Sequence, residues 1–154
     1  MKILVMSDSH GFKNNMLQAV ELEAPDYILH LGDSVRDCAD ITAMYPQIPL
    51  RNVKGNCDRG YQGIEMDEFV LEDKRIFMTH GHLFGVKTGK TRIIEAAVNR
   101  GVDILLFGHT HIPFYSVKDN LTILNPGSIG SPSKPYATIH ISNSEITCDL
   151  KTLP

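Results

Sequence analysis

Short apolar runs and amphipathic stretches alternate along the first half of the chain. The apolar runs, such as Ile104-Leu105-Leu106-Phe107, are continuous, which is typical of strands buried on both faces. We expect such strands at Lys2–Ser7, Asp26–Leu31, Leu50–Val53 and Asp103–Phe107.

Apolar residues at helical spacing occupy the stretches between these runs. The expected helices are Lys13–Glu23, Asp37–Met44 and Thr91–Arg100. Their inward residues are Met16, Leu17, Val20 and Leu22 in the first helix, and Ile93, Ile94, Ala97 and Val98 in the last. Pro46 ends the second helix and Gly101 ends the third.

Pairs of apolar runs around polar turns dominate the second half. Three hairpins are expected, Glu68–Leu71 with Arg75–Thr79, Phe114–Val117 with Leu121–Leu124, and Ala137–Ile141 with Ile146–Leu150. The alternating half favours a mostly parallel sheet, and the hairpins favour a second sheet packed on it. The predicted fold class is therefore α/β, with two stacked sheets flanked by helices in one domain of residues 1–154.

Side chains that can bind metal follow most of the expected strands. They are Asp8, His10, Asp33, Asn56, His80, His109 and His111. In an extended chain His109 and His111 point the same way, roughly 6.6 Å apart at about 3.3 Å per residue. Because two-metal sites hold their ions about 3.5–4 Å apart, this convergence predicts a pair of cations.

A ligand assignment follows because open α/β sheets carry their sites at the carboxyl ends of strands. One cation is assigned Asp8, His10 and His111, and the other is assigned Asn56, His80 and His109. Asp33 bridges both cations, because Asp8 is already tied to His10. A shared hydroxide would add a further ligand and leave one position for substrate. Ligation by nitrogen and oxygen without thiolate suits manganese, iron, zinc or nickel.

Five short motifs, taken in order, resemble those of the calcineurin-like metallophosphoesterases. The motifs are Asp8-Ser9-His10, Gly32-Asp33, Gly55-Asn56-Cys57-Asp58, His80-Gly81 and Gly108-His109-Thr110-His111. The resemblance is to the family's small single-domain phosphodiesterase branch. It implies a four-layer αββα sandwich of two mixed β-sheets, a dinuclear metal site between them and the same seven ligands. We expect Mn²⁺ first among the cations, with Ni²⁺, Zn²⁺ and iron as alternatives.

Cys57 departs from the pattern of most of the family, which has a histidine here that helps protonate the leaving group. A thiol with a pKa near ~8.5 is a poor replacement for an imidazolium, although the small phosphodiesterase branch is similar in carrying cysteine. Asn56 and His82 are the expected catalytic residues, and Asn56, Cys57 and His82 are expected to contact substrate. Asp58 is expected to orient a neighbouring imidazole.

The predicted function is hydrolysis of a phosphodiester bond by a hydroxide that bridges the two metals, which makes the protein a phosphoric diester hydrolase. One alternative is a phosphomonoesterase or nucleotidase that uses the same site. Another is a non-catalytic protein-interaction scaffold of the same fold.

Composition narrows the partners and the compartment. A net charge of −3 without a basic block disfavours nucleic acid, and a nuclease with it. No signal-peptide pattern and no apolar stretch of about 18 residues occurs, so no membrane partner is expected. The three cysteines, Cys38, Cys57 and Cys148, favour a reducing, cytoplasmic location. A small phosphodiester is the expected partner, together with a homo-oligomeric state.

Overall fold

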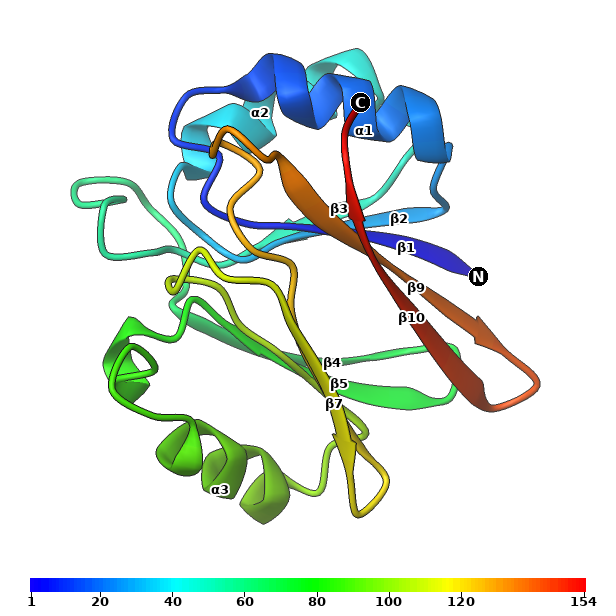
Figure 1. Ribbon diagram of the computed structural model, residues 1–154. Helices are drawn as coiled ribbons and strands as arrows, with labels where there is room; N and C mark the ends of the chain where they lie inside the picture. Colours follow the sequence, from blue (N-terminus) through cyan, green and yellow to red (C-terminus); the bar gives the residue numbers. More distant parts are fainter.

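Two five-stranded sheets stack face to face in the computed structural model, which describes all residues from 1 to 154 (Figure 1). The first sheet, in the order β10-β9-β1-β2-β3, contains β1 (Lys2–Met6), β2 (Tyr27–His30), β3 (Leu50–Asn52), β9 (Pro135–Ser142) and β10 (Glu145–Thr152). The second, in the order β4-β5-β6-β8-β7, contains β4 (Met66–Leu71), β5 (Lys74–Thr79), β6 (Ile104–Leu106), β7 (Phe114–Lys118) and β8 (Leu121–Asn125). Both sheets mix parallel and antiparallel pairs.

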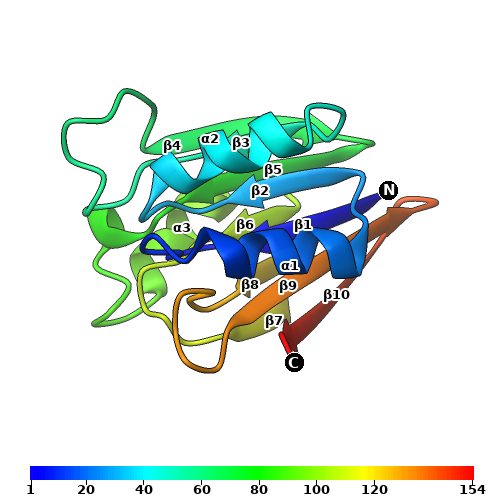
Figure 2. The same cartoon turned by 90° about the horizontal axis from the view of Figure 1, so that it is seen from above.

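Helices cover the outer faces of both sheets. α1 (Lys13–Glu23) and α2 (Val35–Met44) lie on the first sheet, and α3 (Thr91–Arg100) lies on the second (Figures 1 and 2). A short 3₁₀ turn, η1 (His82–Phe84), follows β5. The layers run helix, sheet, sheet, helix, which confirms the predicted four-layer sandwich. No helix is long and apolar enough to span a membrane.

The apolar runs fill the space between the layers. Leu29 and Leu106 belong to the largest core cluster, which lies between the two sheets. Met16 and Ile41 pack under α1 and α2, and Ile93 packs under α3. Strands that are covered on both faces need apolar residues at successive positions, which explains the continuous apolar runs.

Two expected core positions are wrong. Leu22 on α1 is 57% exposed and Val98 on α3 is 61% exposed. α1 faces its sheet through Met16 and Val20, and α3 faces its sheet through Ile93. Leu22 and Val98 fall outside these narrow stripes, so their apolar character does not bring them inside.

Element boundaries differ from the predictions by a few residues. α2 begins at Val35 rather than at Asp37, and Asp37 lies in its first turn. A carboxylate there interacts favourably with the helix dipole, so Asp37 follows the helix start instead of marking it.

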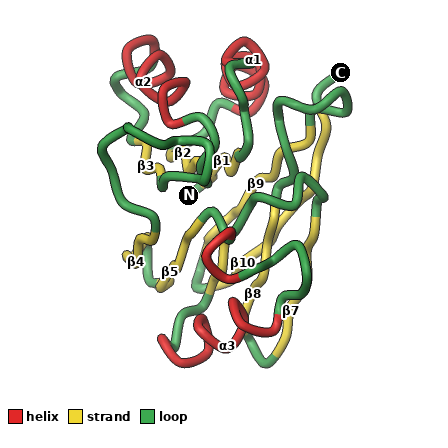
Figure 3. Tube along the Cα trace, turned by 90° about the vertical axis from the view of Figure 1, so that its left-hand side faces the viewer, coloured by secondary structure: helices red, strands yellow, loops and turns green.

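The carboxyl ends of the parallel strands meet on one side of the sandwich. Met6 pairs with His30 across β1 and β2, and Met78 pairs with Leu106 across β5 and β6, so the strand ends are level. Figure 3 looks at this end of the molecule, where the connecting loops lie between α1 and α2 on one side and α3 on the other. The side chains that follow these strands are therefore brought together.

Candidate metal centre

Left-handed backbone carries most of the predicted ligands. Positive φ angles between 48° and 67° occur at Asp8, His10, Asp33, His109 and His111. Such angles are uncommon for residues other than glycine. The expectation that His109 and His111 share one direction in extended chain is therefore wrong. Each lies in the left-handed region, and the two imidazoles join different groups.

Two glycines allow the loops to approach one another closely. A side chain at Gly108 would collide with Ser7 Oγ and Asp8 Oδ2, and one at Gly55 would collide with Asp33 Oδ1. The two carboxylates therefore lie against the backbone of neighbouring loops, where only glycine fits.

The first group of donors contains Asp8, His10 and His111. Asp8 Oδ1 lies 3.1 Å from His111 Nε2 and 3.9 Å from His10 Nε2. The two Nε2 atoms are 3.4 Å apart. All three side chains offer a donor atom within 4.8 Å of the others.

The second group contains Asn56, His80 and His109. His80 Nδ1 donates to the carbonyl of Leu31 at 2.8 Å, so the lone pair of its Nε2 faces the site. That Nε2 lies 3.1 Å from Asn56 Oδ1 and 3.1 Å from His109 Nδ1. Electron-rich atoms converge here, which is the arrangement that a cation requires.

Two buried carboxylates lie between the groups. Asp33 offers a donor atom within 4.8 Å of one of His10 and of one of His80, and its Oδ2 lies 3.4 Å from His80 Nε2. Asp8 Oδ1 also lies 3.9 Å from His80 Nε2, and it has no hydrogen-bond partner. A buried carboxylate oxygen without a partner is costly unless a cation compensates it.

The pKa values in the site are perturbed by burial and by mutual contact. Burial raises the pKa of Asp8, although His80 and His111 oppose it. For Asp33, hydrogen bonding and charge from His80 outweigh partial burial and lower the pKa. For His80, burial is outweighed by the two carboxylates, and the pKa is raised. Burial and then His80 lower the pKa of His109 to about 4, which leaves a neutral imidazole suited to metal ligation.

Cys57 and His82 border the same centre. Cys57 is exposed, its Sγ lies within 4.8 Å of donor atoms of His10 and Asp33, and its N–H donates to Asp33 Oδ1 at 2.8 Å. Burial and Asp33 raise the pKa of the thiol. The His82 ring lies 5.4 Å from that of His80, between centroids.

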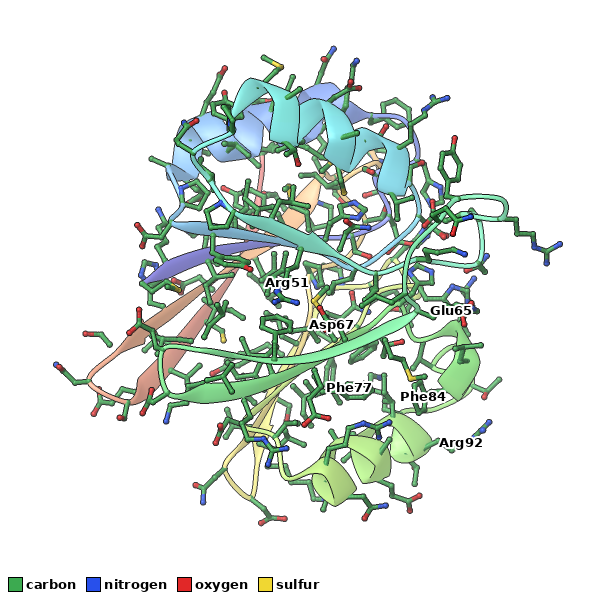
Figure 4. All side chains as sticks on the ribbon, turned by 180° about the vertical axis from the view of Figure 1, so that it is seen from behind. Arg51, Glu65, Asp67, Phe77, Phe84 and Arg92 are labelled. Atoms are coloured by element: carbon green, nitrogen blue, oxygen red, sulfur yellow. The ribbon has the colours of Figure 1, made fainter.

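η1 is anchored by an aromatic contact that also fixes the position of His82. Phe84 packs edge-on against Phe77 of β5, with centroids 6.2 Å apart (Figure 4). Arg51 on β3 and Asp67 on β4 form an ion pair of 2.8 Å that joins the edge strands of the two sheets (Figure 4).

Asp58 does not orient an imidazole, and that expectation is wrong. Its carboxylate accepts the backbone N–H groups of Asp33, Val35 and Gly55 at 2.8, 2.9 and 2.8 Å. Through these backbone donors Asp58 ties the loop after β2 to the loop after β3.

The supporting roles of two buried polar residues were not predicted from the sequence. Asn125 donates to the Gly108 carbonyl at 2.9 Å and to Thr110 Oγ1 at 3.0 Å. Asp37 accepts the Ser9 hydroxyl at 2.7 Å and the Gly11 N–H at 2.9 Å. Asn125 ends β8 and Asp37 lies in the first turn of α2, positions where polar residues are common, so no local signal marked their roles.

Known proteins share both the sequence pattern and the fold. The family model of the calcineurin-like phosphoesterase superfamily domain matches residues 1–144. The probable metallophosphoesterase YsnB of Bacillus subtilis is 35% identical over 158 residues, which cover 96% of this chain and 88% of that protein. Phosphodiesterase YfcE of Escherichia coli K12 is 34% identical over 156 residues, which cover 86% of this chain and 81% of that protein.

Solved structures extend the similarity to three dimensions. A predicted phosphoesterase from Streptococcus pneumoniae has a TM-score of 0.83 at 30% identity, with 98% of this chain and 88% of that chain covered. Vps29 of Entamoeba histolytica in complex with Zn²⁺ shares the fold, with a TM-score of 0.79 at 20% identity and 99% of each chain covered. The chain therefore belongs to the calcineurin-like phosphoesterase superfamily, and its relatives include phosphodiesterases of the small single-domain branch.

Proposed function

We propose that this protein is a metal-dependent phosphodiesterase with a centre for two divalent cations. The observation that carries the proposal is the position of Asp8 Oδ1. This atom is buried without a hydrogen-bond partner, and the Nε2 atoms of His10, His80 and His111 lie within 3.9 Å of it. Relatives named as phosphodiesterases support the same conclusion.

The residues present fit two cations. Asp8, His10 and His111 would hold one, Asn56, His80 and His109 would hold the other, and Asp33 would contact both. Mn²⁺ suits this mixture of nitrogen and oxygen donors, as do Ni²⁺, Zn²⁺ and iron. When bound, such cations withdraw charge from phosphoryl oxygens and make water acidic enough to attack near neutral pH.

The chain's own groups would bind and orient the diester. Asn56 turns its carbonyl oxygen toward His80, and its amide N–H₂ donates one hydrogen to Cys57 Sγ at 3.4 Å, which leaves the other N–H to donate to a phosphoryl oxygen. His82 lies beside the second group and can donate to the same charge as it develops. Cys57 replaces the imidazole that would protonate a poor leaving group, which favours diesters over monoesters.

The test compares two model substrates on one protein preparation. The protein is stripped with a chelator and then loaded with Mn²⁺. We expect hydrolysis of bis(p-nitrophenyl) phosphate to disappear on stripping and to return on loading, and to exceed hydrolysis of p-nitrophenyl phosphate. Turnover that survives complete chelation would refute the metal-dependent mechanism. Faster turnover of the monoester would favour the phosphomonoesterase alternative, and tight Mn²⁺ binding without any turnover would favour the scaffold.

A further inference from the structure

A small polar cavity adjoins the second group of donors. It has a volume of about 150 Å³, and no apolar side chain lines it. Asn56 and His82 form the wall that it shares with the metal centre, and Lys54, Arg59 and Glu65 surround the rest. At about 30 Å³ for one water molecule, this space holds a group the size of a three- to five-carbon polyol.

The lining groups both donate and accept hydrogen bonds. Lys54 and Arg59 offer N–H donors, and Glu65 offers a carboxylate. This mixture of donors and acceptors suits hydroxyl groups, which donate and accept at once.

Glu65 is held in place by the fold. The hydroxyl of Thr79 on β5 donates to the backbone carbonyl of Glu65 at 3.0 Å. Figure 4 shows Glu65 where the long loop after β3 joins β4. Its carboxylate is therefore presented from a fixed backbone position at the edge of the second sheet.

Exposed apolar side chains lie next to the first group of donors, in contrast to the polar cavity beside the second group. Phe12 follows His10 closely and is 57% exposed, and Ile112 directly follows His111 and is 68% exposed. These side chains offer no hydrogen-bonding atoms to a hydroxylated group. The exposed Cys57 thiol is grouped with His10 and Asp33, and Cys57 does not line the polar cavity.

We infer that the polar cavity binds the polyhydroxylated alcohol of an unsymmetrical phosphodiester, a glycerol- or pentose-like unit, while the ester arm that departs lies on the side of Phe12, Ile112 and Cys57. The inference rests on the proposed phosphodiesterase function and names its substrate class. Lys54, Arg59 and Glu65 are then specificity-determining residues, and the diester binds in one orientation.

The test uses two synthetic diesters that differ only in hydroxyl groups. Both release p-nitrophenol, and the retained arm is butyl in one and 3,4-dihydroxybutyl in the other. On the Mn²⁺-loaded protein we expect kcat/KM to be about tenfold higher or more for the diol, because two hydroxyls gain hydrogen bonds. Glu65→Gln and Lys54→Met should each reduce this ratio toward one, and Glu145→Gln on exposed β10 should preserve it.

The ratio separates the outcomes. A variant that only disturbs the fold lowers both rates and keeps the ratio. Turnover of both diesters with equal kcat/KM by the unmodified protein overturns the inference and leaves the phosphodiesterase function intact. If the Mn²⁺-loaded protein cleaves none of the three diesters, including bis(p-nitrophenyl) phosphate, the proposed function is overturned and the inference with it.

Discussion

The carboxylate of Asp58 accepts the backbone N–H of Asp33 at 2.8 Å, and this bond fixes the backbone of the residue whose carboxylate lies between the two groups of donors. Two further backbone donors, from Val35 and Gly55, complete the carboxylate's partners. In Asp58→Asn the side-chain N–H₂ would replace one of the two accepting oxygens, so a donor would face backbone N–H donors. We expect a loss of about 1–3 kcal/mol in the free energy of unfolding and a 10- to 100-fold weaker Mn²⁺ affinity, roughly as for other groups behind a ligand.

Urea denaturation and calorimetric titration with Mn²⁺ measure these two effects. Asp40→Asn is the matched control, because Asp40 is half exposed and pairs only with Lys13. Unchanged Mn²⁺ affinity in Asp58→Asn would contradict a role for Asp58 in positioning Asp33.

Asp33→Asn is expected to remove activity and leave the fold intact. The amide loses the negative charge that both groups of donors share, so more than about a 100-fold loss in turnover of bis(p-nitrophenyl) phosphate should follow. Circular dichroism and the thermal midpoint report the fold. Near-normal turnover would remove Asp33 from the site, and Asp119→Asn on an exposed turn serves as the control.

Cys57→Ser should keep most of the diesterase activity. Burial and Asp33 raise the pKa of the thiol, which makes it a poor proton donor and disfavours the thiolate, so neither covalent catalysis nor acid catalysis is assigned to it. We expect kcat for bis(p-nitrophenyl) phosphate to change by less than about tenfold, below the 10²- to 10⁴-fold that a general acid contributes. A loss of 10²-fold or more, in the range of a catalytic group, would give the thiol a chemical role.

Asn125→Ala should weaken the loop that carries His109 and His111. The variant leaves the Gly108 carbonyl without its donor, and the expected cost is about 1–3 kcal/mol in the free energy of unfolding. The loss of Mn²⁺ affinity should exceed that in Asn99→Ala on the surface of α3. Equal metal affinity in both variants would show that Gly108 keeps the loop in place without Asn125.

Glu23 makes the stability of the fold depend on acid pH. Burial would raise the pKa of this carboxyl, but hydrogen bonds from Lys2, Tyr136 and Lys151 lower it from 4.5 to about 2. The ionised form therefore stabilises the fold above about pH 4.5, by roughly 3 kcal/mol, and this contribution is lost as the pH falls toward 2.

Comparison with Glu23→Gln isolates this effect from other titrating groups. The difference in unfolding free energy between the two proteins should be largest near pH 6 and should narrow steadily from pH 4.5 to pH 2.5. A difference that stays constant over this range would show that the pKa of Glu23 is not lowered in the folded protein.

The periodic parts of the chain were predictable because burial acts on whole elements. The helices at residues 13–23 and 91–100 have the predicted bounds, since each is punctuated by a polar or glycine-containing turn. The conformation of the His109–His111 loop was not predictable from spacing, because left-handed backbone at nonglycine residues is imposed by contacts from distant loops. For the same reason, the roles of Asp58 and Asn125 emerged only from the folded chain.

The left-handed residues in the candidate ligand loops bear on how the protein would capture cations. Conformations that cost about 1–3 kcal/mol each are already adopted by the scaffold, so little reorganisation remains when a cation arrives. The apoprotein carries that conformational penalty, and bound cations would offset it by mass action, by about 2.7 kcal/mol at a hundred times the dissociation constant. Metal scarcity in the cell would then reduce the abundance of the folded protein as well as its activity.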